Sequence, residues 1–117
     1  MMMYRSGLEE RLSKHLEKLN IPYLYECSKY PYVTESKYTP DFFLPNGVII
    51  EAKGFFKPSD RRKMLAVKQQ HPDLDIRFVF QRNNTLSKNS KTTYGAWADK
   101  HGFPWCIYPD IPPDWIQ

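Results

Sequence analysis

The sequence predicts an α/β fold in which helices flank a mixed sheet. Four leucines near the N-terminus recur at helical spacing: Leu8, Leu12, Leu16 and Leu19. In the middle of the chain, two apolar segments surround the turn-forming pair Asn46-Gly47 and predict a β-hairpin. Beyond the hairpin, helix signals alternate with short apolar segments, and a sheet covered by helices is the natural packing for that order. The 117 residues are expected to form one domain with one modest core.

The N-terminal half is expected to hold one helix and several short strands. Ser6 and Glu9 have the spacing of a capping box, so the helix begins after Ser6 and ends before Pro22. Short strands are expected at 23–27 and 30–33, where Pro31 indicates an edge or a crossing segment. The hairpin then spans residues 38–53.

The C-terminal half is expected to alternate helices with strands. Pro58 suits the first turn of a helix, Thr92 or Thr93 can cap the next one, and Gly102 suits its end. Trp115 is expected to dock the C-terminal tail by its ring. The expected order is a helix at 58–70, a strand at 75–80, a loop at 81–91, a helix ending at 101–102 and a strand at 105–108.

Charge is distributed unevenly along the chain. Residues 57–91 hold nine Lys or Arg against three Asp, a net of +6, while the whole chain carries +4. A basic half in a small domain favours polyanion binding. The alternative is an ordinary solvated helix face followed by a solvated loop.

Cysteine, histidine and apolar runs exclude several protein classes. No run approaches the ~20 apolar residues of a membrane span, so no membrane partner is expected. Cys27 and Cys106 form no CxxC pair, which predicts a cytoplasmic protein with reduced thiols. His15, His71 and His101 are scattered and show no zinc spacing, so we expect structural or surface roles for them.

The most informative pattern is Pro40-Asp41, nine residues, and then Glu51-Ala52-Lys53. Side chains alternate along a strand, so Glu51 and Lys53 face the same side, and the hairpin brings Asp41 opposite Glu51 or Ala52. Carboxylates in an apolar sheet are costly unless a divalent cation compensates their charge. Carboxylates that hold Mg²⁺ beside a lysine can hydrolyse a phosphodiester.

Each residue of this pattern also has an ordinary explanation. Asp41 could be an edge-strand residue at a bend, and Lys53 could be a solvated strand end. Glu9 is explained by the capping box alone, although a capping carboxylate can also face a metal. The hairpin context and the basic helix that follows favour a shared site.

With these motifs the chain resembles the phage endonuclease I family. These are the Holliday-junction-resolving enzymes of podoviruses, which belong to the PD-(D/E)XK nuclease superfamily. The segments that carry the resemblance are 4–9, 38–47, 51–54 and 70–77. The resemblance implies a restriction-endonuclease-like core in an intertwined, segment-swapped homodimer. Residues 1–29 would form the first helix and strand, 30–37 the crossing arm and 38–117 the catalytic core, all within one nuclease domain. The chain ends are shorter than in family members, so fewer DNA contacts are expected there.

By resemblance, the catalytic residues are Glu9, Asp41, Glu51 and Lys53. Two Mg²⁺ or Mn²⁺ ions per site are expected, with Asp41 bridging them. Glu51 and the carbonyl of Ala52 would complete one cation site and Glu9 the other. Each active site would take Glu9 from one chain and the remaining residues from its partner. Lys53 would position or help deprotonate the attacking water and stabilise the transition state.

The expected activity is structure-selective cleavage of branched double-stranded DNA during recombination, without a nucleotide cofactor. The protein would act in the cytoplasm of a bacterial host, encoded by a phage or a prophage. Junctions, forks and mismatches remain alternative substrates. The rival functions are another PD-(D/E)XK nuclease of the nicking-repair or transposon-end type, a non-catalytic DNA-binding module, and a structural dimerisation protein. The expected DNA contacts are Arg5, Arg61, Arg62, Lys63, Lys68, Arg82, Lys88 and Lys91.

Overall fold

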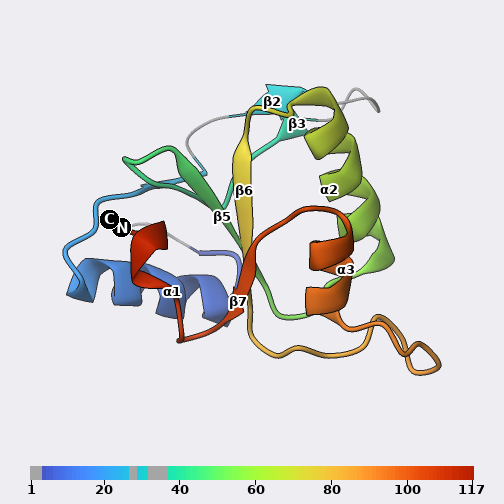
Figure 1. Ribbon diagram of the computed structural model, residues 1–117. Helices are drawn as coiled ribbons and strands as arrows, with labels where there is room; N and C mark the ends of the chain where they lie inside the picture. The colour runs from blue at the N-terminus through green and yellow to red at the C-terminus, as the bar shows by residue number, and fades with distance from the viewer. Residues whose placement is uncertain (1–3, 27–28, 32–36) are drawn as a thin grey trace.

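The structure, a computed structural model, describes residues 4–26, 29–31 and 37–117 (Figure 1). Within these residues, three α-helices and seven strands alternate, and a single 3-10 turn lies near the C-terminus. In chain order the elements are α1 (Gly7–Lys18), β1 (Leu24–Tyr25), β2 (Tyr30–Pro31), β3 (Lys37–Tyr38), β4 (Phe42–Phe43), β5 (Val48–Lys53), α2 (Pro58–Gln70), β6 (Asp75–Phe80), α3 (Tyr94–Lys100), β7 (Trp105–Ile107) and η1 (Pro113–Trp115).

A five-stranded mixed sheet in the order β1-β4-β5-β6-β7 forms the centre of the molecule. The strands β1, β4 and β5 pair antiparallel, whereas β5, β6 and β7 pair parallel. Helix α2 makes the crossover between β5 and β6, and α3 lies between β6 and β7 in the chain. The predicted α/β class with a mixed sheet and flanking helices is therefore confirmed.

Each face of the sheet buries its own apolar cluster. Helix α1 lies on one side of the sheet, and α2 and α3 lie on the other (Figure 1). On one face, α1 packs its leucine stripe on Val48, Ile50 and Val79. On the other face, α2 and α3 cover Ile49 and Phe78. Consecutive residues of β5 thus point to opposite clusters, and a strand buried on both faces needs the continuous apolar run that its sequence shows.

The predicted hairpin is present but shorter than expected. Gly47 has a positive φ of 88°, and its N–H donates to the Leu44 carbonyl at 3.0 Å, which closes the turn. Tyr38, however, belongs to β3, which pairs with β2 in a separate two-stranded ribbon. Pro40 has no N–H for a strand ladder, so the chain breaks between β3 and β4.

The other predicted elements match the structure closely. The helix at 58–70 and the strand at 75–80 have the predicted bounds, and Thr93 caps α3. Of the strand expected at 23–27, the described residues 23–26 form a strand at Leu24–Tyr25, and residue 27 lies outside the described part. The strand expected at 105–108 ends at Ile107. Residues 32–36 of the expected crossing arm lie outside the described part of the chain.

The tail docks on the hairpin turn as expected. Trp115 is buried at 6% exposure. The Asn46 side-chain amide donates to the backbone carbonyls of Trp115 and Gln117 at 2.9 and 3.0 Å. A single turn residue therefore fixes both the hairpin and the C-terminus.

The remaining expectations concern histidine, cysteine and the membrane. His15 contacts the Tyr108 ring, and His101 contacts the Trp97 ring, so both have packing roles. Cys106 is a buried free thiol whose pKa burial raises to about 12, and Cys27 lies outside the described residues. Among the described helices, none has the length and apolar character that crossing a bilayer requires.

Candidate active site

The β4–β5 hairpin places Asp41 against Glu51. The register pairs Phe42 with Ile50, so Asp41 lies across from Glu51. The Asp41 N–H donates to Glu51 Oε2 at 2.8 Å, and the Ala52 N–H donates to Asp41 Oδ2 at 3.0 Å. Both carboxylates are buried, with 2% and 1% exposure. The expected convergence of these two acids is confirmed.

Helix α1 brings a third carboxylate to the same place. The Ser6 hydroxyl accepts the Glu9 N–H at 3.1 Å, so Ser6 is the N-cap that the sequence predicted, and the same hydroxyl donates to Glu9 Oε1 at 3.2 Å. Glu9 is buried, and one of its oxygens lies within 4.8 Å of an oxygen of Asp41. Glu9 therefore bonds to the N-cap residue of its helix and lies at the site at the same time.

The sequence analysis did not single out Glu26, which the structure adds to this group. Its carboxylate lies within 4.8 Å of those of Glu9 and Asp41. Arg5 spans two of these acids, with Nε at 2.9 Å from Glu26 Oε1 and Nη2 at 3.4 Å from Asp41 Oδ1. Glu26 follows the short strand β1 in a left-handed conformation, and no local sequence pattern marks such a residue.

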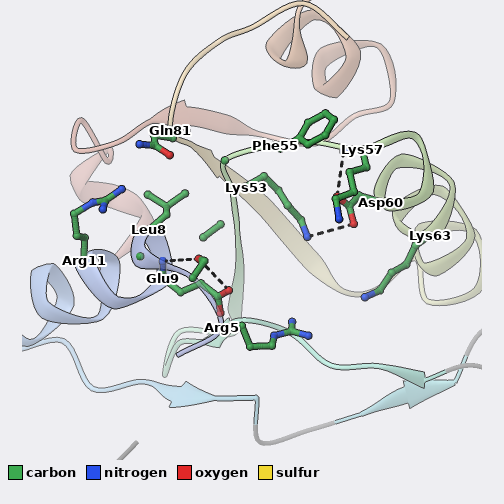
Figure 2. A pocket seen from close by; sticks show the side chains of 14 residues that line it. Arg5, Leu8, Glu9, Arg11, Lys53, Phe55, Lys57, Asp60, Lys63 and Gln81 are labelled. Carbon is green, nitrogen blue, oxygen red and sulfur yellow. Dashed lines mark hydrogen bonds and ion pairs between the residues drawn. The ribbon is translucent and has the colours of Figure 1, made fainter. Parts of the chain in front are cut away.

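Lys53 stands on the β5 side of the site and points toward α2 (Figure 2). Its Nζ lies 3.9 Å from Asp60 Oδ1. Burial lowers the pKa of Lys53, but Glu51, Asp41 and Asp60 outweigh burial and raise it above its ordinary value. Lys53 is therefore a cation at neutral pH, which suits charge stabilisation better than proton abstraction.

The two most buried acids of the site, Asp41 and Glu51, have raised pKa values. Burial raises the pKa of Asp41 well above its ordinary value, with Glu51 and Glu9 adding to the effect and Lys53 opposing it. Burial also raises the pKa of Glu51, against the attraction of Lys53. Elevated values of this kind, caused first by burial, are typical of functional sites.

The donor set suits a hard divalent cation. Three carboxylates offer oxygens within 4.8 Å of one another, those of Glu9, Glu26 and Asp41. The Glu51 carboxylate adjoins them because it accepts the backbone N–H of Asp41. Carboxylate and carbonyl oxygens are the preferred ligands of Mg²⁺ and Mn²⁺. The elevated pKa values of the buried acids give a second reason, because a cation would favour the charged forms that burial disfavours.

The site opens into a cleft of about 590 Å³ between the start of α1 and α2 (Figure 2). Cations outnumber acids along its walls, which suits a phosphate backbone. The cationic side chains that line the cleft are Arg5, Arg11, Lys53, Lys57 and Lys63. Of the expected DNA contacts, the structure thus brings Arg5 and Lys63 to the cleft, and it adds Arg11 and Lys57, which the sequence analysis did not name.

The other expected DNA contacts lie elsewhere. Arg61 Nη1 donates to the Phe56 carbonyl at 2.8 Å, and Lys68 Nζ donates to the Gly102 carbonyl at 3.3 Å. Both side chains therefore help to hold α2 in place. The exposed side chains are Arg62 on α2 and Arg82, Lys88 and Lys91 on the loop that precedes α3.

A further buried polar group lies behind Glu51. The Tyr38 hydroxyl is buried and lies close to the Glu51 carboxylate. Burial, then the charges of Glu51 and Asp41, raise the pKa of Tyr38 well above its ordinary value. The Lys63 ammonium lies over its ring at 5.7 Å from the centroid, so Tyr38 links the acids to the cationic wall.

The sequence of this chain matches known proteins over most of its length. The family model described as Phage endonuclease I matches residues 1–117. "Endonuclease I" of Escherichia phage T7 is 47% identical over 118 aligned positions, which cover 97% of this chain and 78% of that protein. "Endodeoxyribonuclease 1" of Enterobacteria phage T3 is 50% identical over 103 positions, which cover 85% of this chain and 68% of that protein.

Proposed function

This chain belongs to the phage endonuclease I family, and from that membership we propose that it is a metal-dependent endodeoxyribonuclease that cleaves branched double-stranded DNA, including Holliday junctions. The convergence of Asp41, Glu51 and Glu9 beside Lys53 at a cation-lined cleft carries the proposal. Its place of action would be the cytoplasm of a bacterial host.

Each site residue has a role that follows from its surroundings. Asp41, Glu51 and the carbonyl of Ala52 would hold one divalent cation, while Asp41 and Glu9 would hold a second. When bound, Mg²⁺ or Mn²⁺ would supply Lewis-acid stabilisation of the scissile phosphate. The Lys53 ammonium would stabilise the additional negative charge of the transition state and orient the attacking water.

We further propose that the working unit is an intertwined homodimer. In the structure, Glu9 lies close to Asp41, and the two residues belong to different described segments, 4–26 and 37–117. The connection between these segments includes residues 27–28 and 32–36, which lie outside the described part of the chain. If the crossing arm carries the first segment to a second copy, the same contact is made between two chains. Two sites held at a fixed angle would then select the arms of a branched DNA by shape.

Cleavage of branched against linear DNA is the direct test of this function. The purified chain should cut a four-way junction in Mg²⁺ much faster than a linear duplex of the same sequence, and EDTA should stop both reactions. Equal cleavage of the two substrates would favour a nicking nuclease of the same superfamily. Metal-independent binding without cleavage would favour a DNA-binding module.

The exposed loop before α3 is expected to contact a DNA arm through phosphates. Binding that neutralises phosphates releases counterions, with a slope of log K against log salt of about −0.9 per contact. Removing two loop cations in the variant Lys88→Ala/Lys91→Ala should therefore weaken junction binding and flatten this slope by about two. Binding is measured by fluorescence anisotropy over a salt series, and cleavage of saturated complexes should stay near the wild-type rate.

The matched control for this test removes two positive charges from helix ends instead of the loop. Lys18 ends α1 and Lys100 ends α3, and both are exposed. The variant Lys18→Ala/Lys100→Ala should keep the wild-type slope. An unchanged slope in the loop variant would show that the loop does not touch DNA.

A further inference from the structure

The end of strand β1 contacts the site, yet the proposed mechanism assigns nothing to it. Tyr25 is the last residue of β1, and its register partner is Phe42, which immediately follows Asp41. Pairing with β4 therefore delivers the Tyr25 side chain next to the acids. Its ring packs against Tyr4 and Phe42, with centroids 4.6 and 5.4 Å away.

Within the described residues, the polar groups around the Tyr25 hydroxyl are the Arg5 backbone, the Glu9 carboxylate and the Glu26 carboxylate. The hydroxyl accepts the backbone N–H of Arg5 at 3.1 Å and donates to Glu9 Oε2. Because the Arg5 N–H approaches an acceptor lone pair, the single hydroxyl hydrogen is left for a carboxylate, and Glu9 Oε2 is the oxygen to which the hydroxyl donates.

Ion pairs hold Arg5, whose backbone N–H donates to the Tyr25 hydroxyl. Its guanidinium is paired with Glu26 and Asp41, so the backbone that meets the Tyr25 hydroxyl is held by two acids of the site. The other Glu9 oxygen accepts the Ser6 hydroxyl at 3.2 Å. Both carboxylate oxygens of Glu9 thus have a donor, and the plane of the carboxylate is determined from two sides.

We propose that Tyr25 is a positioning residue that orients the Glu9 carboxylate for the second divalent cation. The inference rests on the proposed function, because it assigns Glu9 as a ligand. Hydrogen-bond partners of metal ligands fix the orientation of the ligand, and their loss typically costs 10- to 100-fold in metal affinity.

The positioning role does not depend on which chain supplies Asp41. Arg5, Glu9, Tyr25 and Glu26 all belong to residues 4–26, on one side of the expected crossing arm. In a swapped dimer this segment moves as a unit, and Tyr25 stays with the Glu9 that it orients. The contacts to Asp41, the pairing of β1 with β4 and the packing of α1 on β5 would then cross between copies.

A purely structural role for the Tyr25 ring makes a different prediction, and Tyr23 provides the matched control. Tyr23 packs on the same Phe42 ring, with centroids 5.2 Å apart, but its hydroxyl bonds to Tyr4 and Glu17 and not to the site acids. Tyr25→Phe and Tyr23→Phe each remove one hydroxyl and keep the ring. The two variants should therefore lose a similar amount of packing, whereas only Tyr25→Phe should weaken metal binding.

The test is Mn²⁺ titration of the full chain by calorimetry, without DNA, at constant pH. Tyr25→Phe should weaken one Mn²⁺ binding step about tenfold and raise the Mg²⁺ concentration for half-maximal junction cleavage, whereas Tyr23→Phe should match the wild type. Wild-type Mn²⁺ binding with an unaffected Tyr25→Phe variant would overturn this inference alone. A wild-type protein that binds no Mn²⁺ would overturn it together with the proposed function.

Discussion

Replacing Asp41 with asparagine is expected to lower junction cleavage about a thousandfold while junction binding persists. Asp41 is the central acid of the site, since its carboxylate accepts the Ala52 N–H and lies within 4.8 Å of Glu9 and Glu26 oxygens. A thousandfold loss corresponds to about 4 kcal/mol of transition-state stabilisation, within the range that a bound cation supplies. Binding should survive because the substitution removes a carboxylate paired with Arg5, one of the cations that line the cleft, and removes no cation from its walls. Single-turnover cleavage and anisotropy measure the two effects separately.

The same substitution should stabilise the metal-free fold. The folded state raises the pKa of Asp41 because burial and the neighbouring Glu51 disfavour its charged form. As pH rises above the ordinary carboxyl value of about 4, the unfolded chain releases its proton first, and this contribution to folding stability falls until the pH passes the folded pKa. Asp41→Asn removes that loss, so its free energy of unfolding at pH 7 in EDTA should exceed the wild-type value.

Thermal unfolding against pH checks the stability effect. The midpoint of Asp41→Asn in EDTA should rise, by roughly 4 °C for each kcal/mol of stability gained in a domain of this size. Mg²⁺ should raise the midpoint of the wild type but not that of Asp41→Asn. The control is Asp73→Asn, an exposed aspartate between α2 and β6, which should change neither midpoint nor cleavage. Loss of both binding and cleavage in Asp41→Asn would instead point to misfolding or a direct DNA contact.

Local sequence signals predicted much of the fold. Asn46-Gly47 determined the turn, and the turn set the register that brings Asp41 to Glu51. The helix at 58–70 and the strand at 75–80 were predicted with their observed bounds because proline, capping and continuous apolar runs act over a few residues. The hairpin that brings Asp41 to Glu51 belongs to this class of locally encoded structure.

The parts that sequence did not predict depend on contacts between distant segments. Glu26 and Tyr25 reach the site because β1 pairs with β4, and a two-residue strand has no recognisable alternation. The number of cations in residues 57–91 indicated polyanion binding, but it could not separate Lys63 in the cleft from Lys68, which bonds to the Gly102 carbonyl. Side-chain partners of this kind are determined by tertiary packing and not by composition.

The last prediction concerns which chain donates Glu9. Mixed dimers of Glu9→Ala and Asp41→Ala chains, separated by two affinity tags, distinguish the alternatives. If Glu9 acts in the partner's site, one site of the heterodimer carries both lesions and the other is intact. Roughly half of the wild-type rate of single-site nicking should remain, and paired cleavage of the junction should be lost. Both homodimeric variants should be inactive in the same assay.

The opposite result has an equally clear physical meaning. In the structure, Glu9 and Asp41 of one chain already lie within 4.8 Å, through their carboxylate oxygens. If each site uses Glu9 from its own chain, every site of the heterodimer carries one lesion, and nicking should fall to the level of the homodimeric variants. Such a result would contradict the proposed swapped dimer but not the proposed roles of the site residues. The contacts of Glu9 with Ser6 and Tyr25 are the same in both cases, so the assay isolates the path of the connecting arm.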